Sequence, residues 1–131
     1  MAEHPNVESA RAGFEAFMKG DVETMAAGIA DDAVWHIPGT NRFAGTFEGK
    51  PAILARFQAQ AEAGVRVVFD EIHDIVGNDD HVVALLRTSL QAPGGSASGD
   101  AVFVMHVSAG RMTEAWVSNE HQAEIDRLIG S

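Results

Sequence analysis

The sequence predicts an α+β fold in which helices come first and a strongly bent, mainly antiparallel sheet follows. Two observations carry this prediction. Up to Gly64 apolar residues recur at the spacing of helices, and from Val65 onward they alternate with polar residues at the spacing of strands. The connections between the later segments are short, which favours strands that run antiparallel to their neighbours.

Two helices are expected before residue 30. Gly20 should end the first, because glycine readily adopts the left-handed conformation that closes a helix. Asp21 is a natural N-cap for a short second helix. The apolar positions expected to be buried are Val7, Ala10, Phe14, Phe17 and Met18 in the first helix and Val22, Met25 and Ile29 in the second.

A short strand, a loop and a third helix are expected next. The strand covers residues 33–37 and carries Trp35 and His36 side by side. Residues 38–49 contain three glycines and are expected to form an irregular loop. Pro51 suits the first turn of a helix that ends at Gly64.

The second half of the chain predicts a four-stranded antiparallel meander and a closing helix. The expected strands cover residues 65–76, 81–91, 98–108 and 111–118, and the helix covers residues 120–129. Neither an internal repeat nor a linker interrupts the pattern, so residues 1–131 are expected to form one domain.

Composition excludes several classes of partner. The formal net charge of −10 argues against nucleic acid and anionic membrane surfaces, since both repel an acidic protein. The chain has no cysteine, which rules out disulfides and thiolate metal sites, and no spacing of histidines and carboxylates indicates a metal. No cofactor motif occurs, so none is expected. The chain shows no signal peptide or membrane-spanning run, which favours a cytoplasmic location.

Three phrases carry a resemblance to a known family: GDVETMAAGIADDAVWHIPG, HDIVGNDDHVVAL and SAGRMTEAW. With the order of elements they resemble the SnoaL-like branch of the nuclear-transport-factor-2-like superfamily, over about residues 6–128. That superfamily includes ketosteroid isomerases, polyketide cyclases and limonene epoxide hydrolases. The resemblance implies a cone-shaped α+β barrel, a deep apolar pocket inside the curved sheet and, usually, a homodimer.

The catalytic residues that the resemblance implies are largely replaced in this chain. Ile37 stands where ketosteroid isomerases have a basic aspartate, and the chain has no tyrosine for their oxyanion hole. Polyketide cyclases place an aspartate after the tryptophan that matches Trp116, whereas this chain has Val117. The Arg-x-Asp pair of the epoxide hydrolases corresponds to Arg87 and Ser89, so the arginine is kept and the carboxylate is lost.

Arg87 and Ser89 are nevertheless candidate catalytic residues. They lie on a face of the predicted strand 81–91 that changes from apolar to polar halfway along, as expected for a pocket with a few polar groups. A guanidinium can hold a carboxylate or an enolate oxygen. The alternative is a structural ion pair with Asp100, Glu71 or Asp70, or a contact between subunits.

His36 is the candidate general base, because an imidazole exchanges protons near neutral pH. Which of Trp35 and His36 points inward stays open, because the isomerase and hydrolase patterns give opposite answers. His106 either joins a polar cluster with Asp100 near Arg87 or lies on the surface. The expected pocket wall consists of Phe14, Trp35, Ile37, Phe57, Phe69, Phe103, Met105, His106, Trp116 and Val117, and His4, His73, His81 and His121 are expected at the periphery.

Two hypotheses of function follow. In the first, the chain binds a small, largely apolar, carbonyl-bearing molecule in the barrel and acts on it by acid–base chemistry as an isomerase, cyclase or hydrolase. The missing aspartates and tyrosine favour the second, a non-catalytic ligand-binding or dimerisation module of the same fold. In either case a small molecule and a second copy of the chain are the expected partners.

Overall fold

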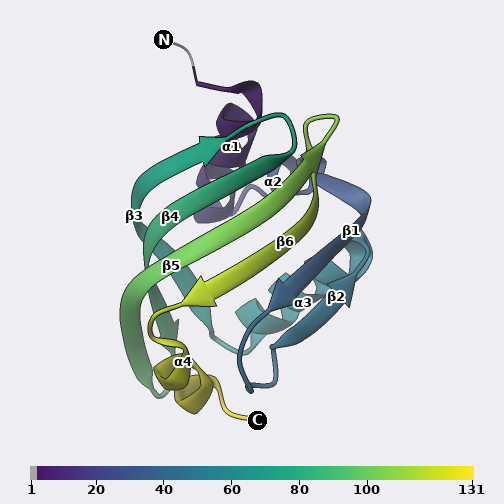
Figure 1. Ribbon diagram of the computed structural model, residues 1–131. Coiled ribbons are helices and arrows are strands. Elements are labelled where there is room, and N and C mark those ends of the chain that lie inside the picture. The colour runs from purple at the N-terminus through teal and green to yellow at the C-terminus, as the bar shows by residue number, and fades with distance from the viewer. Residues whose placement is uncertain (1–2) are drawn as a thin grey trace.

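The computed structural model describes residues 3–131, and in this range it has four helices and a six-stranded sheet (Figure 1). The helices are α1 (Pro5–Lys19), α2 (Val22–Ala27), α3 (Lys50–Glu62) and α4 (Gln122–Ile129). The strands are β1 (Ile29–Ile37), β2 (Gly45–Glu48), β3 (Arg66–Gly77), β4 (His81–Ala92), β5 (Gly95–Ser108) and β6 (Arg111–Asn119).

The sheet has the order β2-β1-β6-β5-β4-β3 and curls into an open cone. Strands β1 and β6 run parallel, and every other neighbouring pair is antiparallel. Helix α1 packs against β3 and β4 and helix α3 against β1 and β2, while α4 lies at the lower end of β5 in Figure 1. The predicted α+β fold with helices held in a strongly curved, mainly antiparallel sheet is confirmed, although β2 and β3 remain free edges and the barrel does not close.

Local signals set the helix ends as expected. Asp21 accepts hydrogen bonds from the backbone N–H of Thr24 at 3.2 Å and from its hydroxyl at 2.6 Å, which starts α2. Gly20 has φ of 73°, a conformation that costs glycine little, and it ends α1.

Two segments differ from the prediction. Strand β1 begins at Ile29, which was expected in the second helix, because Ile29 pairs with Met112 of β6 and is buried there. Met18 and Val22, also expected to be buried, are exposed. Part of the expected loop forms β2, where Phe47 pairs with Trp35 of β1. Four residues, the first of them a glycine, are too few to show a strand period, so only this pairing defines the strand.

Aromatic rings fill much of the space between the helices and the concave face of the sheet. Phe14 meets Phe69 and Phe103 edge-on with centroids 5.3 and 5.4 Å apart, and Trp35 lies 4.9 Å from Phe57. These contacts tie α1 and α3 to three strands that are far apart in the sequence. Within residues 3–131 no helix is long and apolar enough to cross a membrane.

Candidate functional site

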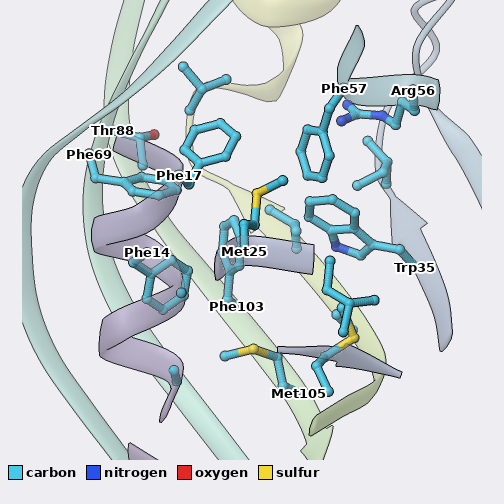
Figure 2. A pocket seen from close by; sticks show the side chains of 18 of the residues that line it. Phe14, Phe17, Met25, Trp35, Arg56, Phe57, Phe69, Thr88, Phe103 and Met105 are labelled. Carbon is cyan, nitrogen blue, oxygen red and sulfur yellow. The ribbon is translucent and has the colours of Figure 1, made fainter. Parts of the chain in front are cut away.

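A cavity of about 210 Å³ lies inside the curved sheet, and residues of all four helices contribute to its wall (Figure 2). Its wall is mostly apolar and rich in aromatic side chains. Eight of the ten residues predicted for the pocket wall line it: Phe14, Trp35, Ile37, Phe57, Phe69, Phe103, Met105 and Val117. These eight residues lie in the cavity wall, and their contact with a ligand remains a prediction.

The alternation of strands decides which side chains face this cavity. Successive residues of a strand point to opposite sides of the sheet, so Trp35 and Ile37 point inward together and His36 points outward. On β5, Phe103 and Met105 point inward and His106 outward. The open question of Trp35 against His36 is thereby answered in favour of the tryptophan.

His36 lies on the outer face, away from the position expected of a general base. Its Nε2 lies 2.7 Å from Glu114 Oε2 and its Nδ1 lies 3.2 Å from the Thr46 hydroxyl. The imidazole stacks on Trp116 with centroids 5.2 Å apart and ring planes 11° apart. Because the sheet separates His36 from the cavity, it cannot act there as a base.

Arg87 and Ser89 also lie outside, contrary to the prediction that they face the pocket. Arg87 Nη1 lies 3.2 Å from Asp100 Oδ1 in a largely exposed ion pair, which is the structural alternative raised by the sequence. Ser89 donates a hydrogen bond to Asp70 and lies 3.0 Å from the Ser98 hydroxyl. The face of β4 that changes from apolar to polar is the solvent side.

His106 and Trp116, the two remaining predicted wall residues, lie on this same outer face. His106 Nδ1 is 3.8 Å from Glu114 Oε1, and the His106 ring meets Trp116 edge-on at 4.9 Å. Trp116 borders a separate surface hollow with His36 and Thr46. The registers of β5 and β6 therefore exclude both side chains from the interior.

The polar groups of the cavity are different ones, and Arg56 is the first. It projects from α3, and its guanidinium carbon lies 5.7, 5.6 and 5.9 Å from the ring centroids of Trp35, Phe47 and Phe57. Its Nε donates to the backbone oxygen of Phe43 at 2.9 Å. Burial lowers the pKa of Arg56 to about 10, so the side chain is still a cation at neutral pH.

His121 is the second and was expected at the periphery. It follows β6 at the N-cap of α4, lines the cavity and is only 7% exposed. Neither of its ring nitrogens has a hydrogen-bond partner within the described chain. Burial lowers the pKa of His121 below its ordinary 6.5, which favours the neutral ring at pH 7. Gly99, a glycine inside a strand, was a signal for such a close approach, because the imidazole packs against it.

Other polar groups line the wall as well. Thr88 of β4 and Gln60 of α3 are buried residues that face the cavity. The indole Nε1 of Trp35 is buried and lacks a partner among residues 3–131. An apolar cavity with a few isolated hydrogen-bonding groups is the usual constitution of a small-molecule site. Sequence patterns alone missed Thr88 because it follows an apolar period.

A hydrogen-bond network holds the chain at one end of the cavity. Asp126 of α4 accepts hydrogen bonds at Oδ1 from Asn41 Nδ2 at 2.7 Å and Gln122 Nε2 at 3.0 Å. Burial would raise the pKa of Asp126, but these bonds and others from Thr40 outweigh it and hold the pKa below its usual value. The loop before β2 is thereby fixed to the C-terminal helix.

The described residues hold no group of three or more His, Cys, Asp or Glu side chains arranged to bind a metal ion. The candidate site is therefore described by its cavity, its aromatic wall and the polar groups Arg56, Gln60, Thr88 and His121.

A cone-shaped α+β fold with an interior cavity is the architecture of the nuclear-transport-factor-2-like proteins. A protein of this class from Burkholderia xenovorans superposes with a TM-score of 0.84 at 24% identity, covering 99% of both chains. The sequence model of the family called SnoaL-like domain matches residues 10–115 of this chain, and the chain belongs to this family.

Further similarities agree with this assignment. The structure of Bal32a, from a soil-derived mobile gene cassette, has a TM-score of 0.84 and 26% identity, covering 96% of this chain and 97% of that one. An uncharacterized protein of Mycobacterium tuberculosis is 25% identical over 114 residues, 86% of this chain and 87% of its own length.

Proposed function

We propose that the protein binds a small, largely apolar, carbonyl-bearing molecule in the cavity inside its sheet. The observation that carries this proposal is the cavity wall of aromatic and aliphatic side chains, interrupted by a few polar groups. Burying an apolar ligand body there is favourable in proportion to the area removed from water.

A carbonyl group suits the polar part of this wall. Its oxygen accepts hydrogen bonds, and the wall offers donors in the hydroxyl of Thr88, the amide of Gln60 and the guanidinium of Arg56. A hydrocarbon without an acceptor would leave these groups unmatched, whereas a strongly polar ligand would lose its hydration against the aromatic rings.

The two tryptophans allow a direct test, because Trp35 lies in the cavity wall and Trp116 on the outer face. In a Trp116→Phe variant, titration with 2-acetylnaphthalene should quench the fluorescence of Trp35 saturably. The matched Trp35→Phe variant, which keeps only the outer tryptophan, should show no saturable change. The absence of saturable quenching, together with an unchanged melting temperature, would contradict ligand binding in the cavity.

Acid–base catalysis is a second candidate function, and His121 is the residue that favours it. A neutral imidazole with two unpartnered nitrogens in a cavity wall can accept a proton from carbon next to a carbonyl. In heavy water, the enzyme hypothesis predicts that the methyl protons of 2-acetylnaphthalene exchange for deuterium faster with the wild type than with His121→Gln. Binding without exchange of this probe would support a non-catalytic binding module.

We also propose that a second copy of the chain covers the outer face of β4, β5 and β6. Leu85 of β4 is 37% exposed there, half-buried Trp116 of β6 lies on the same face, and no helix of the described chain covers this face (Figure 1). Light scattering should give a dimer mass for the wild type and a monomer mass for Leu85→Glu. Val22→Glu, at an exposed apolar position on α2, is the control and should leave the mass unchanged. A monomeric wild type would refute the proposal.

A further inference from the structure

We infer that the ligand carries an anionic oxygen group, such as a carboxylate, and that Arg56 is its anchor. This inference rests on the proposed function, because it assigns a chemical class to the molecule bound in the cavity. It makes the ligand an aromatic or alicyclic acid whose charged end lies at α3 and whose apolar body lies among the rings.

Packing holds Arg56 at the cavity. The α3 residues Ile53 and Gln60, one turn before and after it, are buried on the same side of the helix. The rings of Trp35 and Phe57 and the Nε–H bond to the Phe43 backbone oxygen fix the guanidinium in place. Figure 2 shows the guanidinium directed from α3 toward these rings.

What Arg56 lacks is an anion. Within residues 3–131 no carboxylate oxygen lies within 4 Å of its guanidinium, and its two terminal nitrogens donate no hydrogen bond. Among the described residues Arg11, Arg87 and Lys50 each pair with a carboxylate. The other cations without such a partner, in contrast to half-buried Arg56 in the cavity wall, are exposed to water: Lys19, Arg42, Arg66, Arg111 and Arg127. Arg56 is therefore a half-buried cation of the cavity wall without a carboxylate partner in the described chain.

The aromatic rings stabilise the positive charge of Arg56 but do not supply acceptors for its N–H groups. They attract a cation electrostatically through their faces, but they offer no oxygen to the N–H groups along the edge of the guanidinium. Two parallel N–H donors match the two oxygens of a carboxylate, and such charge-assisted bonds are stronger than neutral ones. A ligand acid would supply the partner that the protein does not.

A row of aromatic rings that leads away from Arg56 indicates where the rest of the ligand lies. Trp35 contacts Phe57 next to Arg56, Phe103 lies 6.5 Å from Trp35, and Phe69 lies 6.1 Å from Phe103. Phe69 pairs in register with Thr88, so a row of rings runs from Arg56 to the Thr88 hydroxyl on the other side of the cavity (Figure 2). A flat apolar body fits between these two polar ends.

Two probes of the same shape separate charge from apolar binding: 2-naphthoic acid, an anion at pH 7, and the neutral 2-naphthamide. Calorimetric titration of the wild type should show the acid binding at least about tenfold more tightly than the amide. Arg56→Met, which keeps an apolar stem, should remove this preference, and Arg56→Lys should retain part of it because it keeps the charge.

Arg42→Met is the matched control. Arg42 also lies over a ring, 5.0 Å from the centroid of Phe43, and donates to the Ile129 backbone oxygen at 3.1 Å, but it is not part of the cavity wall. Its replacement should leave the preference for the acid intact. Melting temperatures of all variants show whether they fold, and the comparison of acid with amide in the wild type needs no variant.

The outcomes separate this inference from the proposed function. Equal affinities of acid and amide in the wild type would overturn the anionic ligand while leaving small-molecule binding in place. A preference for the acid that persists in folded Arg56→Met would overturn the role of Arg56. Failure of both probes to bind, together with failure of 2-acetylnaphthalene, would overturn the inference and the proposed function alike.

Discussion

The imidazole of His121 packs directly against Gly99, at the place where any other residue would carry its Cβ. A Cβ on Gly99 would lie 3.0 Å from the Cγ of His121 and still closer to its Nδ1. Gly99 pairs with Thr88 across β4 and β5, so this contact places the histidine beside the Thr88 rung of the sheet. The C-terminal segment thereby brings a buried polar ring to the cavity.

Gly99→Ala should therefore displace His121 and destabilise the fold. The added methyl group overlaps a ring that is itself packed, and overpacking of this kind typically costs about 1–3 kcal/mol. Chemical denaturation measures the change in the free energy of unfolding. Gly94→Ala is the control, because a Cβ there meets nothing within 4 Å. Equal stabilities of the two variants would show that the contact is not tight.

Gly13→Leu should raise stability and abolish ligand binding. Gly13 lies within α1 and lines the cavity, and a Cβ there has open space around it. Replacing glycine in a helix by leucine gains up to about 1 kcal/mol from propensity, and the new side chain occupies ligand volume. Thermal melting and titration with 2-acetylnaphthalene check both effects.

The same substitution at a neighbouring position controls this experiment. Ala12 is exposed on the same helix, so Ala12→Leu should leave binding unchanged. Undiminished binding by a folded Gly13→Leu protein would place the ligand outside the cavity.

Arg87→Ala should have little effect on stability or on ligand affinity. The ion pair of Arg87 with Asp100 is largely exposed, and exposed pairs contribute about 0–1 kcal/mol. The sheet also separates Arg87 from the cavity. Unfolding curves and probe titrations compare the variant with the wild type. A large loss of affinity would restore the catalytic or anchoring role that the sequence predicted for this arginine.

Stability should decline as the pH falls below about 6.5, and His121 should cause part of the decline. Because burial lowers its pKa in the folded state, the unfolded chain takes up the proton first, and protonation then favours unfolding. The stability associated with neutral His121 is fully present above the pKa that this residue has in the unfolded chain. It is lost as the pH falls toward the lower pKa of His121 in the folded protein. Melting temperatures between pH 7.5 and 5.5 should fall less steeply for His121→Gln. Parallel slopes for the two proteins would show that His121 does not titrate in this way.

Apolar periodicity predicted most of the fold because the segments with helical spacing and those with strand spacing are long enough to show their period. The switch from helical to strand spacing at Gly64 separates α3 from the long strands β3 to β6, as the structure confirms. Two short features were not predicted, because they are too short to show a period. Strand β2 has four residues and the start of β1 depends on pairing with β6, so neither could be recognised without its partner.

The site was harder to predict because a strand has two faces and the sequence does not say which one is inside. Polar residues on β4 suggested a pocket at Arg87 and Ser89, yet that face meets solvent, and Thr88 between them faces the cavity. Arg56 lies within α3, and His121 lies at the N-cap of α4. No sequence motif marks either position as part of a site.

The sequence by itself determined the order of the elements apart from β2, the bent and mainly antiparallel sheet and most of the aromatic wall, since these follow from local period and residue type. Its phrases also carry the resemblance to the SnoaL-like family. The tertiary structure alone decided that Trp35 faces inward and His36 outward, and that Arg56 and His121 share one cavity. The physical reason is that strand register and the docking of α3 and α4 depend on contacts between residues far apart in the chain, which no local pattern records.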